Sequence, residues 1–300
     1  MCGIVGLFAK NTSIKARLGT LISDMLEVMT DRGPDSAGVA IYKNNKLQSI
    51  KLTLYSSRPK EDFVNLKRFL ASKKIKISME TVFSSAVLYV SKVHIEKVID
   101  TLAVNFPSIR LVSKGKKIEI YKDVGKPKTI VDNFNLRKMS GTHAIGHTRM
   151  ATESAVTTLG AHPFSTGYDQ CLVHNGSLSN HNSLRRELIR KNMDFETEND
   201  SEVAASYLTE KMDNGADLGQ ALKHSVKDFD GFYTFVVGTA DGFGVLRDPI
   251  ACKPAVLAET KDYVAFGSEY RALASLPDIE EAKVWEPEPG IVYFWDQNNG

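Results

Sequence analysis

The amino-acid sequence predicts an α+β fold in which sheets pack on one another and helices lie outside them. Three observations support this prediction. The chain starts with an apolar run, residues 2–9, that is typical of a buried strand. Many further short apolar runs follow it, and few segments have the periodicity of a helix. Elements of this kind bury their apolar faces most readily when sheet packs against sheet.

The first 50 residues predict a strand, a helix and a second strand. The strand at 2–9 begins with Cys2, and the second strand is expected at 37–42. Between them, residues 15–35 carry an apolar stripe at helical spacing. The stripe consists of Leu18, Leu21, Ile22, Met25 and Met29.

Residues 51–138 predict a basic α+β insert with a small core of its own. They hold 19 Lys and Arg against 8 Asp and Glu, a net charge of +11, so that the rest of the chain carries −9 of the total +2. Helices are expected at 61–74 and 94–106, a strand at 81–90, and a hairpin at 109–121 that turns near Lys114 and Gly115. The charge favours either a solvated face or a docking surface for an acidic partner. No nucleic-acid motif is present, so we expect no nucleic-acid partner.

Apolar strands resume in the second half of the chain. Strands are expected at 143–151, 171–178, 232–240, 242–248, 254–259 and 263–269, and helices near 181–191 and 201–212. No apolar run approaches the ~18 residues that span a bilayer, so no membrane association is expected. The start of the chain has no basic region or cleavage site of a signal peptide.

The cysteines Cys2, Cys171 and Cys252 form an odd, widely spaced set, which argues against a disulfide framework and predicts a cytoplasmic protein. Cys171 and Cys252 are expected to be inert core thiols. His143 and His147 share one face of a predicted strand, but no cysteine or carboxylate lies near them in the sequence. We therefore expect no metal site.

Cys2 is the first candidate for chemistry. Removal of Met1 would leave a residue with both a thiol and a free α-amine, and an α-amine titrates near ~8. Such an amine can act as the base for its own thiol, which can then attack an acyl carbon. The alternative for a single cysteine is a small buried hydrophobe.

Four stretches behind "MCGIVG" strengthen the first interpretation. They are "DRGPDSAGVA" at 31–40, "GHTRMATES" at 146–154, "VHNGSLSN" at 173–180 and "TENDSEVAA" at 197–205. In this order they resemble the class II glutamine amidotransferase domain, which belongs to the amino-terminal nucleophile hydrolases. The resemblance covers residues 2–50 and about 141–295. It implies a four-layer αββα sandwich over 2–300, interrupted by the insert at 51–138, with Cys2 at the mouth of a cleft.

The resemblance also assigns roles to individual residues. Cys2 would be the nucleophile, and Asn175 and Gly176 would donate to the oxyanion of the tetrahedral intermediate. Arg149 would hold the α-carboxylate of glutamine and Asp200 its α-ammonium. The further substrate contacts would be Thr152 and His162, and the residues of the loop over the pocket would be Arg32, Gly33 and Asp35.

Each assignment has a structural alternative. Arg149 alone could be a surface arginine, and Asn175-Gly176 is a common hairpin turn. Asp200 could cap a helix, which is compatible with binding an ammonium group. His162 could belong to a plain turn before a proline, and Glu269 could begin a helix.

One departure from the family bears on the pocket, and another bears on the partner. Met150 stands where relatives have tryptophan, so the rim of the pocket differs. The sequence has no dinucleotide-binding or Walker loop and no cysteine set for an iron–sulfur cluster, so we expect no cofactor in this chain. No acceptor domain follows the amidotransferase domain. The chain therefore looks like the amidotransferase subunit of a split glutamate synthase or N-methylglutamate synthase, in which flavin and iron–sulfur chemistry sits on other chains.

These features predict a glutaminase that supplies ammonia to a partner synthase subunit, and they are compatible with a homo-oligomer. Two alternatives from other classes stay open. One is an amino-terminal nucleophile hydrolase that cuts a different amide, in which Arg149 and Asp200 would not clamp glutamine. The other is a non-catalytic regulatory or scaffold subunit, which would tolerate loss of Cys2.

Overall fold

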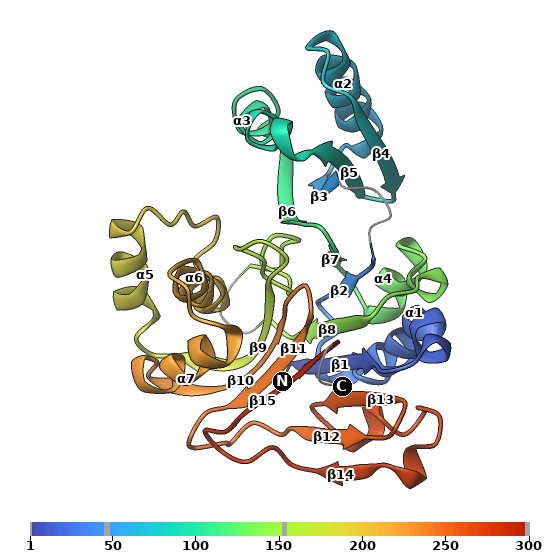
Figure 1. Cartoon of the computed structure of the whole chain (residues 1–300), viewed down its shortest axis with the longest axis vertical. Coiled ribbons are helices and arrows are strands. Elements are labelled where there is room, and N and C mark those ends of the chain that lie inside the picture. The colour runs from blue at the N-terminus through green and yellow to red at the C-terminus, as the bar shows by residue number, and fades with distance from the viewer. Residues whose placement is uncertain (1, 45–48, 152–154, 298–300) are drawn as a thin grey trace.

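The structure is a computed structural model that describes residues 2–44, 49–151 and 155–297. A seven-stranded antiparallel sheet forms one half of the main body, with the strand order β14-β12-β13-β1-β8-β2-β7 (Figure 1). Its strands are β1 (Gly3–Ala9), β2 (Ser36–Tyr42), β7 (Ile118–Val124), β8 (His143–Arg149), β12 (Val256–Glu259), β13 (Tyr263–Gly267) and β14 (Lys283–Trp285). Every residue of β1 is buried, as the apolar start of the chain predicts.

A four-stranded sheet, with the order β15-β11-β10-β9, packs against the first sheet. Its strands are β9 (Cys171–Leu178), β10 (Gly231–Gly238), β11 (Gly242–Arg247) and β15 (Val292–Asp296). Side chains from both sheets share one apolar cluster, which includes Ile4, Phe8, Ile145, Val173 and Val236. This cluster is the layer between the two sheets.

Helices cover the outer face of each sheet. Helices α1 (Thr12–Val28) and α4 (Pro127–Asn133) pack on the seven-stranded sheet. Helices α5 (His181–Arg190), α6 (Asp200–Asp213) and α7 (Leu218–Asp228) pack on the four-stranded sheet. The order helix, sheet, sheet, helix confirms the predicted αββα sandwich. Short 3-10 turns occupy Thr30–Arg32, Lys92–His94, Leu136–Lys138, Tyr270–Ala272 and Ile279–Glu281.

A third sheet, with the order β4-β5-β3-β6, projects from the main body at the top of Figure 1. Its elements are β3 (Ser49–Ser56), α2 (Pro59–Ser72), β4 (Ile77–Val82), β5 (Ser85–Ser91), α3 (Ile95–Asn105) and β6 (Ile109–Gly115). Its own apolar cluster includes Leu52, Leu54, Leu66, Leu88 and Val98. We call residues 49–115 the insert module.

The insert module is shorter than the 51–138 expected from charge. Residues 109–121 do not form a hairpin, because β6 pairs with β3 while β7 pairs with β2 of the main sheet. The following α4 packs on the main body beside α1. The run at 81–90 is also not one strand, because the chain turns at Phe83 and Ser84 between β4 and β5.

One helix was missed and one further expectation was wrong. Helix α7 was not predicted, although Asp217 and Gln220 form a capping box at its start. Cys252 is exposed rather than in the core. Cys171 is buried as expected, and burial raises the pKa of its thiol to about 11. None of the helices in the described ranges combines the length and apolarity needed to cross a membrane.

Candidate active site

Cys2 lies at one end of the seven-stranded sheet, directly before β1. The register pairs Gly3 with Thr148 of β8, and Ser36 of β2 with Arg149. The start of β1, the end of β8 and the start of β2 therefore meet at the same end of the sheet. Cys2 is half-buried, and its Sγ atom lies 3.9 Å from the carbonyl oxygen of Met150.

Asn175 reaches Cys2 from the opposite sheet. Alternate residues of β9 face opposite ways, so Asn175 points to the same side as Val173, toward the layer between the sheets. Its Nδ2 atom donates to the backbone carbonyl of Cys2 over 3.2 Å. Asn175 pairs with Thr234 inside the β9–β10 ladder, which excludes a hairpin turn at this position.

Gly176 follows with a backbone conformation that favours glycine. Its φ is +150°, and a Cβ atom there would lie 2.0 Å from the carbonyl oxygen of Phe232. A side chain at this position would therefore collide with backbone of the neighbouring strand β10.

Arg32 binds the same carbonyl group of Cys2 from a second direction. Its Nε atom donates to that oxygen over 2.9 Å, and its Nη1 atom forms an ion pair with Glu269. Glu269 also contacts Arg271 at 2.6 Å. Desolvation would raise the pKa of the Glu269 carboxyl, but the bond with Arg32 and the charges of Arg32 and Arg271 outweigh it and lower the pKa. Glu269 thus anchors Arg32 and does not start an α-helix.

The loop after Arg32 is joined to the end of β8. A Cβ atom on Gly33 would lie 2.4 Å from the carbonyl carbon of Thr148, so the two backbones touch. The backbone N–H of Asp35 donates to Arg149 over 3.1 Å, and its carboxylate accepts from the N–H of Ala151 over 2.8 Å. This loop therefore positions the segment that leads to residue 152. Thr152 itself lies outside the described residues.

Arg149 is buried, which excludes a plain surface arginine. Its Nη1 atom donates to the carbonyl of Ala155 over 3.3 Å, and a Cβ atom on Gly160 would lie 3.3 Å from the same nitrogen. The segment 155–160 therefore packs over the guanidinium group. Binding of a substrate carboxylate by Arg149 stays a prediction.

Asp200 is the first residue of α6, and the capping residue of this helix is its neighbour Asn199. The Asp200 carboxylate instead accepts from the backbone N–H of Leu178 over 2.9 Å and lies 3.6 Å from Nδ1 of His174. Desolvation opposes ionisation, but the bonds from His174 and Leu178 outweigh it and lower the pKa of Asp200 to about 2. Asp200 is therefore an anion at neutral pH and ties α6 to the end of β9.

A buried histidine cluster lies next to β9 and includes His174, which points away from Asn175, and sequence reasoning missed this cluster. The Ser201 hydroxyl contacts Nδ1 of His174 at 3.0 Å and Nε2 of His162 at 2.9 Å. The ring of His162 stacks on that of His147 at 4.0 Å, and His147 donates to the carbonyl of His174 over 3.0 Å. Burial lowers the pKa of His147 to about 3 and that of His162 well below its usual value. The available signal was the period-two alternation of β9, which turns His174 away from Asn175.

His162 therefore lies inside this buried cluster, next to Pro163 in a cis peptide bond. Its contact with substrate stays a prediction. His143 also has structural partners, because its ring stacks on Tyr42 at 4.0 Å and contacts the carbonyl of Thr239 at 2.9 Å. Within the described ranges, no group of three or more His, Cys, Asp or Glu side chains could hold a metal ion.

The sequence of the chain is similar to those of known glutamine amidotransferases. The family model described as glutamine amidotransferase domain matches residues 147–275. The chain is 60% identical over 296 residues to glutamine amidotransferase-like protein GlxB of Rhizobium meliloti (strain 1021), covering 99% of this chain and 98% of that protein. It is 33% identical over 309 residues to a putative glutamine amidotransferase of Methanothermobacter thermautotrophicus, covering 98% and 99%.

Among solved structures, glutamine phosphoribosylpyrophosphate amidotransferase from B. subtilis matches with a TM-score of 0.64 and 20% identity. The match covers 99% of this chain and 48% of that chain, and it shows a shared fold. The two relatives, each matched over nearly its whole length, and the family match over residues 147–275 lead to one conclusion: the chain belongs to the glutamine amidotransferase family.

Proposed function

We propose that the chain hydrolyses the side-chain amide of glutamine through a thioester on Cys2 and supplies the ammonia to a partner protein. One observation carries this proposal: Arg32 and Asn175, from separate parts of the chain, both bind the carbonyl of Cys2. Two donors on one carbonyl fix the backbone of the nucleophile. Positioning of this kind supplies much of the rate enhancement in acyl transfer.

The reaction begins with loss of the thiol proton to the α-amine of Cys2, once Met1 has been removed. The sulfur attacks the amide carbon of glutamine, and the carbonyl oxygen takes up the negative charge. The amine then gives its proton to the amide nitrogen, the C–N bond breaks, and ammonia leaves. Water attacks the remaining thioester, the C–S bond breaks, glutamate is released, and the thiol regains its proton.

Residues around Cys2 can stabilise the charges of the substrate and of the reaction intermediate. Asn175 and the backbone of Gly176 stand at the strand end nearest Cys2, where they can donate to the oxyanion. Arg149 supplies a buried guanidinium for the α-carboxylate of glutamine. Asp200, ionised at neutral pH, supplies an anion for the α-ammonium.

A diazo-ketone analogue of glutamine tests the nucleophile and the substrate together. The untagged protein should lack Met1 and should carry one covalent adduct on Cys2. Excess glutamine should prevent formation of this adduct. Intact and peptide mass spectra give both readouts. Cys252→Ala is the matched control, because it removes the exposed cysteine and should leave labelling unchanged.

Other outcomes distinguish the alternatives. An adduct that glutamine does not prevent would indicate an amide hydrolase with a different substrate. A retained Met1, or a Cys2 that is never labelled, would indicate a regulatory or scaffold subunit.

We further propose that the ammonia acceptor is a separate synthase subunit, resembling glutamate synthase, which carries any flavin or iron–sulfur cofactor. The expected setting is the cytoplasm. This part extends the resemblance to stand-alone amidotransferase subunits, and it is supported by a relative, named only as a glutamine amidotransferase-like protein, of which the chain covers 98%. Co-purification of the chain with a flavoprotein that makes glutamate only when both are present would support it, and a homogeneous protein that is fully active alone would contradict it.

A further inference from the structure

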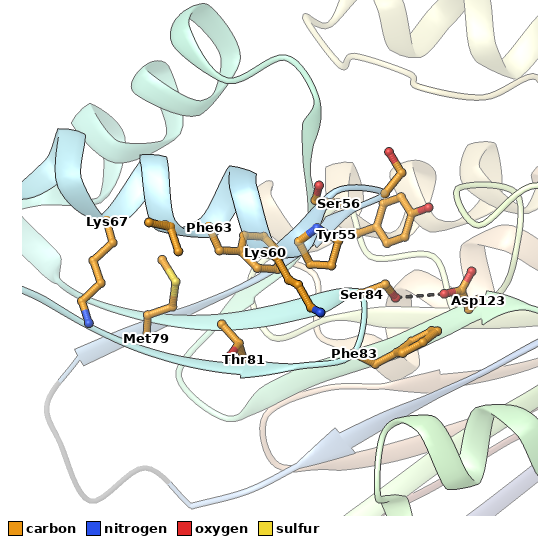
Figure 2. A pocket seen from close by; sticks show the side chains of 13 residues that line it. Tyr55, Ser56, Lys60, Phe63, Lys67, Met79, Thr81, Phe83, Ser84 and Asp123 are labelled. Atoms are coloured by element: carbon orange, nitrogen blue, oxygen red, sulfur yellow. Dashed lines mark hydrogen bonds between the residues drawn. The ribbon is translucent and has the colours of Figure 1, made fainter.

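A cleft of about 820 Å³ lies where the insert module meets the main body (Figure 2). Its walls are α2, the end of β3, the turn between β4 and β5, and Asp123 of β7. Figure 2 shows Phe63 of α2 and Met79 of β4 in the space between the helix and the sheet. Tyr55 and Phe83 close the end toward the main body. The cleft is therefore largely apolar.

Lysine side chains border this apolar cleft. Lys60 and Lys67 are seven residues apart on α2, so they lie on the same face of the helix. A second cleft, of about 530 Å³, shares Lys67 and continues past the end of α2 along Lys74 and Lys76. The side chains of Lys60, Lys67 and Lys74 are exposed, and none of them forms an ion pair with a described residue. Together the two clefts form what we call the lysine groove.

Two large apolar side chains at the groove are open to solvent. Phe83 is 54% exposed and Val64 is 45% exposed. Phe83 has a φ of +49°, which is uncommon for a bulky residue, and its ring packs edge-on against Phe134 of the main body at 5.6 Å. The turn that carries Phe83 is thus held against the main body with apolar surface left uncovered.

We propose that the lysine groove binds an acidic segment with one apolar side from the ammonia-accepting protein. Three unpaired lysines beside apolar surface complement such a segment in charge and in chemistry. Helix α2 has 14 residues and therefore runs ~21 Å, which suits a peptide segment better than a small molecule. The identity of the donor protein rests on the proposed function, whereas binding of the segment does not.

The groove is also connected to the segment that covers Arg149. The hydroxyl of Thr158 donates to Asp123 over 2.7 Å and lies 3.3 Å from the hydroxyl of Tyr55. Ser84 donates to the same carboxylate over 2.9 Å (dashed line in Figure 2). Tyr55 and Asp123, which both line the groove, therefore contact Thr158 directly, and Ser84 is linked to Thr158 through Asp123. Thr158 belongs to the 155–160 stretch that packs on the guanidinium of Arg149, so occupation of the groove changes the glutamine site.

The experiment selects peptides of random sequence, about 14 residues long to span ~21 Å as a helix, against the intact protein. The enriched peptides should carry acidic residues and apolar residues at helical spacing. Binding of a selected peptide, measured by fluorescence anisotropy, should weaken ~10-fold or more in K60E/K67E. The matched control is K92E/K97E, which makes the same charge change at exposed lysines outside the groove and should bind normally.

Four results would overturn the proposal. The first two are enrichment of neutral or basic peptides and no enrichment at all. The third is an equal loss of binding in K60E/K67E and in K92E/K97E. The fourth is self-association of the chain that K60E/K67E abolishes, which would assign the groove to a second copy of the chain. Normal labelling of Cys2 alongside any of these would leave the proposed function standing. Conversely, if the protein binds such peptides but Cys2 is never labelled, the proposed function is contradicted and the proposed binding groove is supported.

A kinetic measurement tests the connection to the glutamine site. Addition of the selected peptide should change kcat/KM for glutamine about 5-fold or more. Thr158→Val removes the hydroxyl and keeps the shape of the side chain, so the peptide should still bind it but the change in kcat/KM should disappear. A peptide effect of equal size in Thr158→Val would overturn the proposed connection.

Discussion

The side-chain amide of Asn175 donates to the backbone carbonyl of Cys2 across the interface between the two sheets. The bond joins the β9 strand to the first residue before β1, which lie far apart in the sequence. It means that the four-stranded sheet, and the helices behind it, help to hold the amino terminus in place. Changes on either sheet can therefore reach the proposed nucleophile.

Asn175→Ala should lower kcat for glutamine hydrolysis by ~100-fold or more, because one donor to the oxyanion and one donor to Cys2 are lost together. Steady-state release of glutamate measures the effect. Ser177→Ala, at an exposed position of the same strand, is the control and should stay close to wild type. An Asn175→Ala enzyme with unchanged kcat would remove this residue from the oxyanion site.

Arg149→Ala should raise KM for glutamine by about 100-fold, since a charge-assisted pair of hydrogen bonds to a carboxylate is worth ~3 kcal/mol. Titration of glutamine in the glutaminase assay gives this number. A thermal unfolding midpoint close to that of the wild type should show that the fold is intact. If KM does not change, the substrate is an amide without this carboxylate.

The Asp200 carboxylate should stabilise the fold in a defined pH range. Its pKa is lowered from 3.8 to about 2, so the contribution is complete above pH ~4 and disappears as the pH falls toward 2. Asp200→Asn should therefore lower the free energy of unfolding by about 2 kcal/mol near neutral pH and by much less near pH 2. Urea unfolding at several pH values measures both variants, and a difference that does not depend on pH would contradict the assignment.

Lys122 should also make the free energy of unfolding rise with pH, but in an alkaline range. Its ammonium is buried against the carbonyls of Leu159, Ala161 and Pro163, and burial lowers its pKa from 10.5 to about 8. The unfolded chain therefore binds more protons than the folded chain between these values, and stability rises with pH there. Relative to Lys122→Met, the wild-type protein should gain about 3 kcal/mol between pH 8 and 10.5. Parallel curves for the two proteins would show that Lys122 keeps an ordinary pKa.

Gly176→Ala should destabilise the protein by ~3 kcal/mol, because it adds a backbone collision to an unfavourable φ. Gly215→Ala is the matched control. Gly215 also has a positive φ, +95°, but a Cβ atom there meets nothing within 4 Å, so only about 1 kcal/mol is expected. Thermal unfolding ranks the two variants, and equal losses would show that the close contact with Phe232 is relieved at no cost.

Patterns within one element were read correctly from the sequence. The apolar start of the chain became β1, and the stripe from Leu18 to Met25 became the buried face of α1, although this helix ends at Val28 and not near residue 35 as expected. The run at 171–178 was predicted to be a strand, and β9 has these bounds, with Asn175 and Gly176 inside it. These features depend on residues a few positions apart, which is the range that periodicity can report.

Features that depend on which strands pair with each other could not be predicted from local sequence patterns. Residues 109–121 look like a hairpin, yet β6 and β7 belong to different sheets, because each finds its partner elsewhere in the chain. The turn at Phe83 and Ser84 contains no Gly, Pro, Asn or Asp, which are the strongest turn signals, so the β4–β5 hairpin was missed. Glu269 as the anchor of Arg32 had no local signal either, since 237 residues separate the two.

The insert module arises within a single strand pair of the main body. Tyr42 at the end of β2 pairs with Ile118 at the start of β7, and Lys43 bonds to Lys117 just beyond them. The module thus occupies the place of a hairpin turn, and both of its connections leave from one point. Long additions at such points cost a fold little. Relatives could exchange the module for another of different surface chemistry while keeping the catalytic sandwich, which makes this hairpin a natural position for changing the choice of partner during evolution or by design.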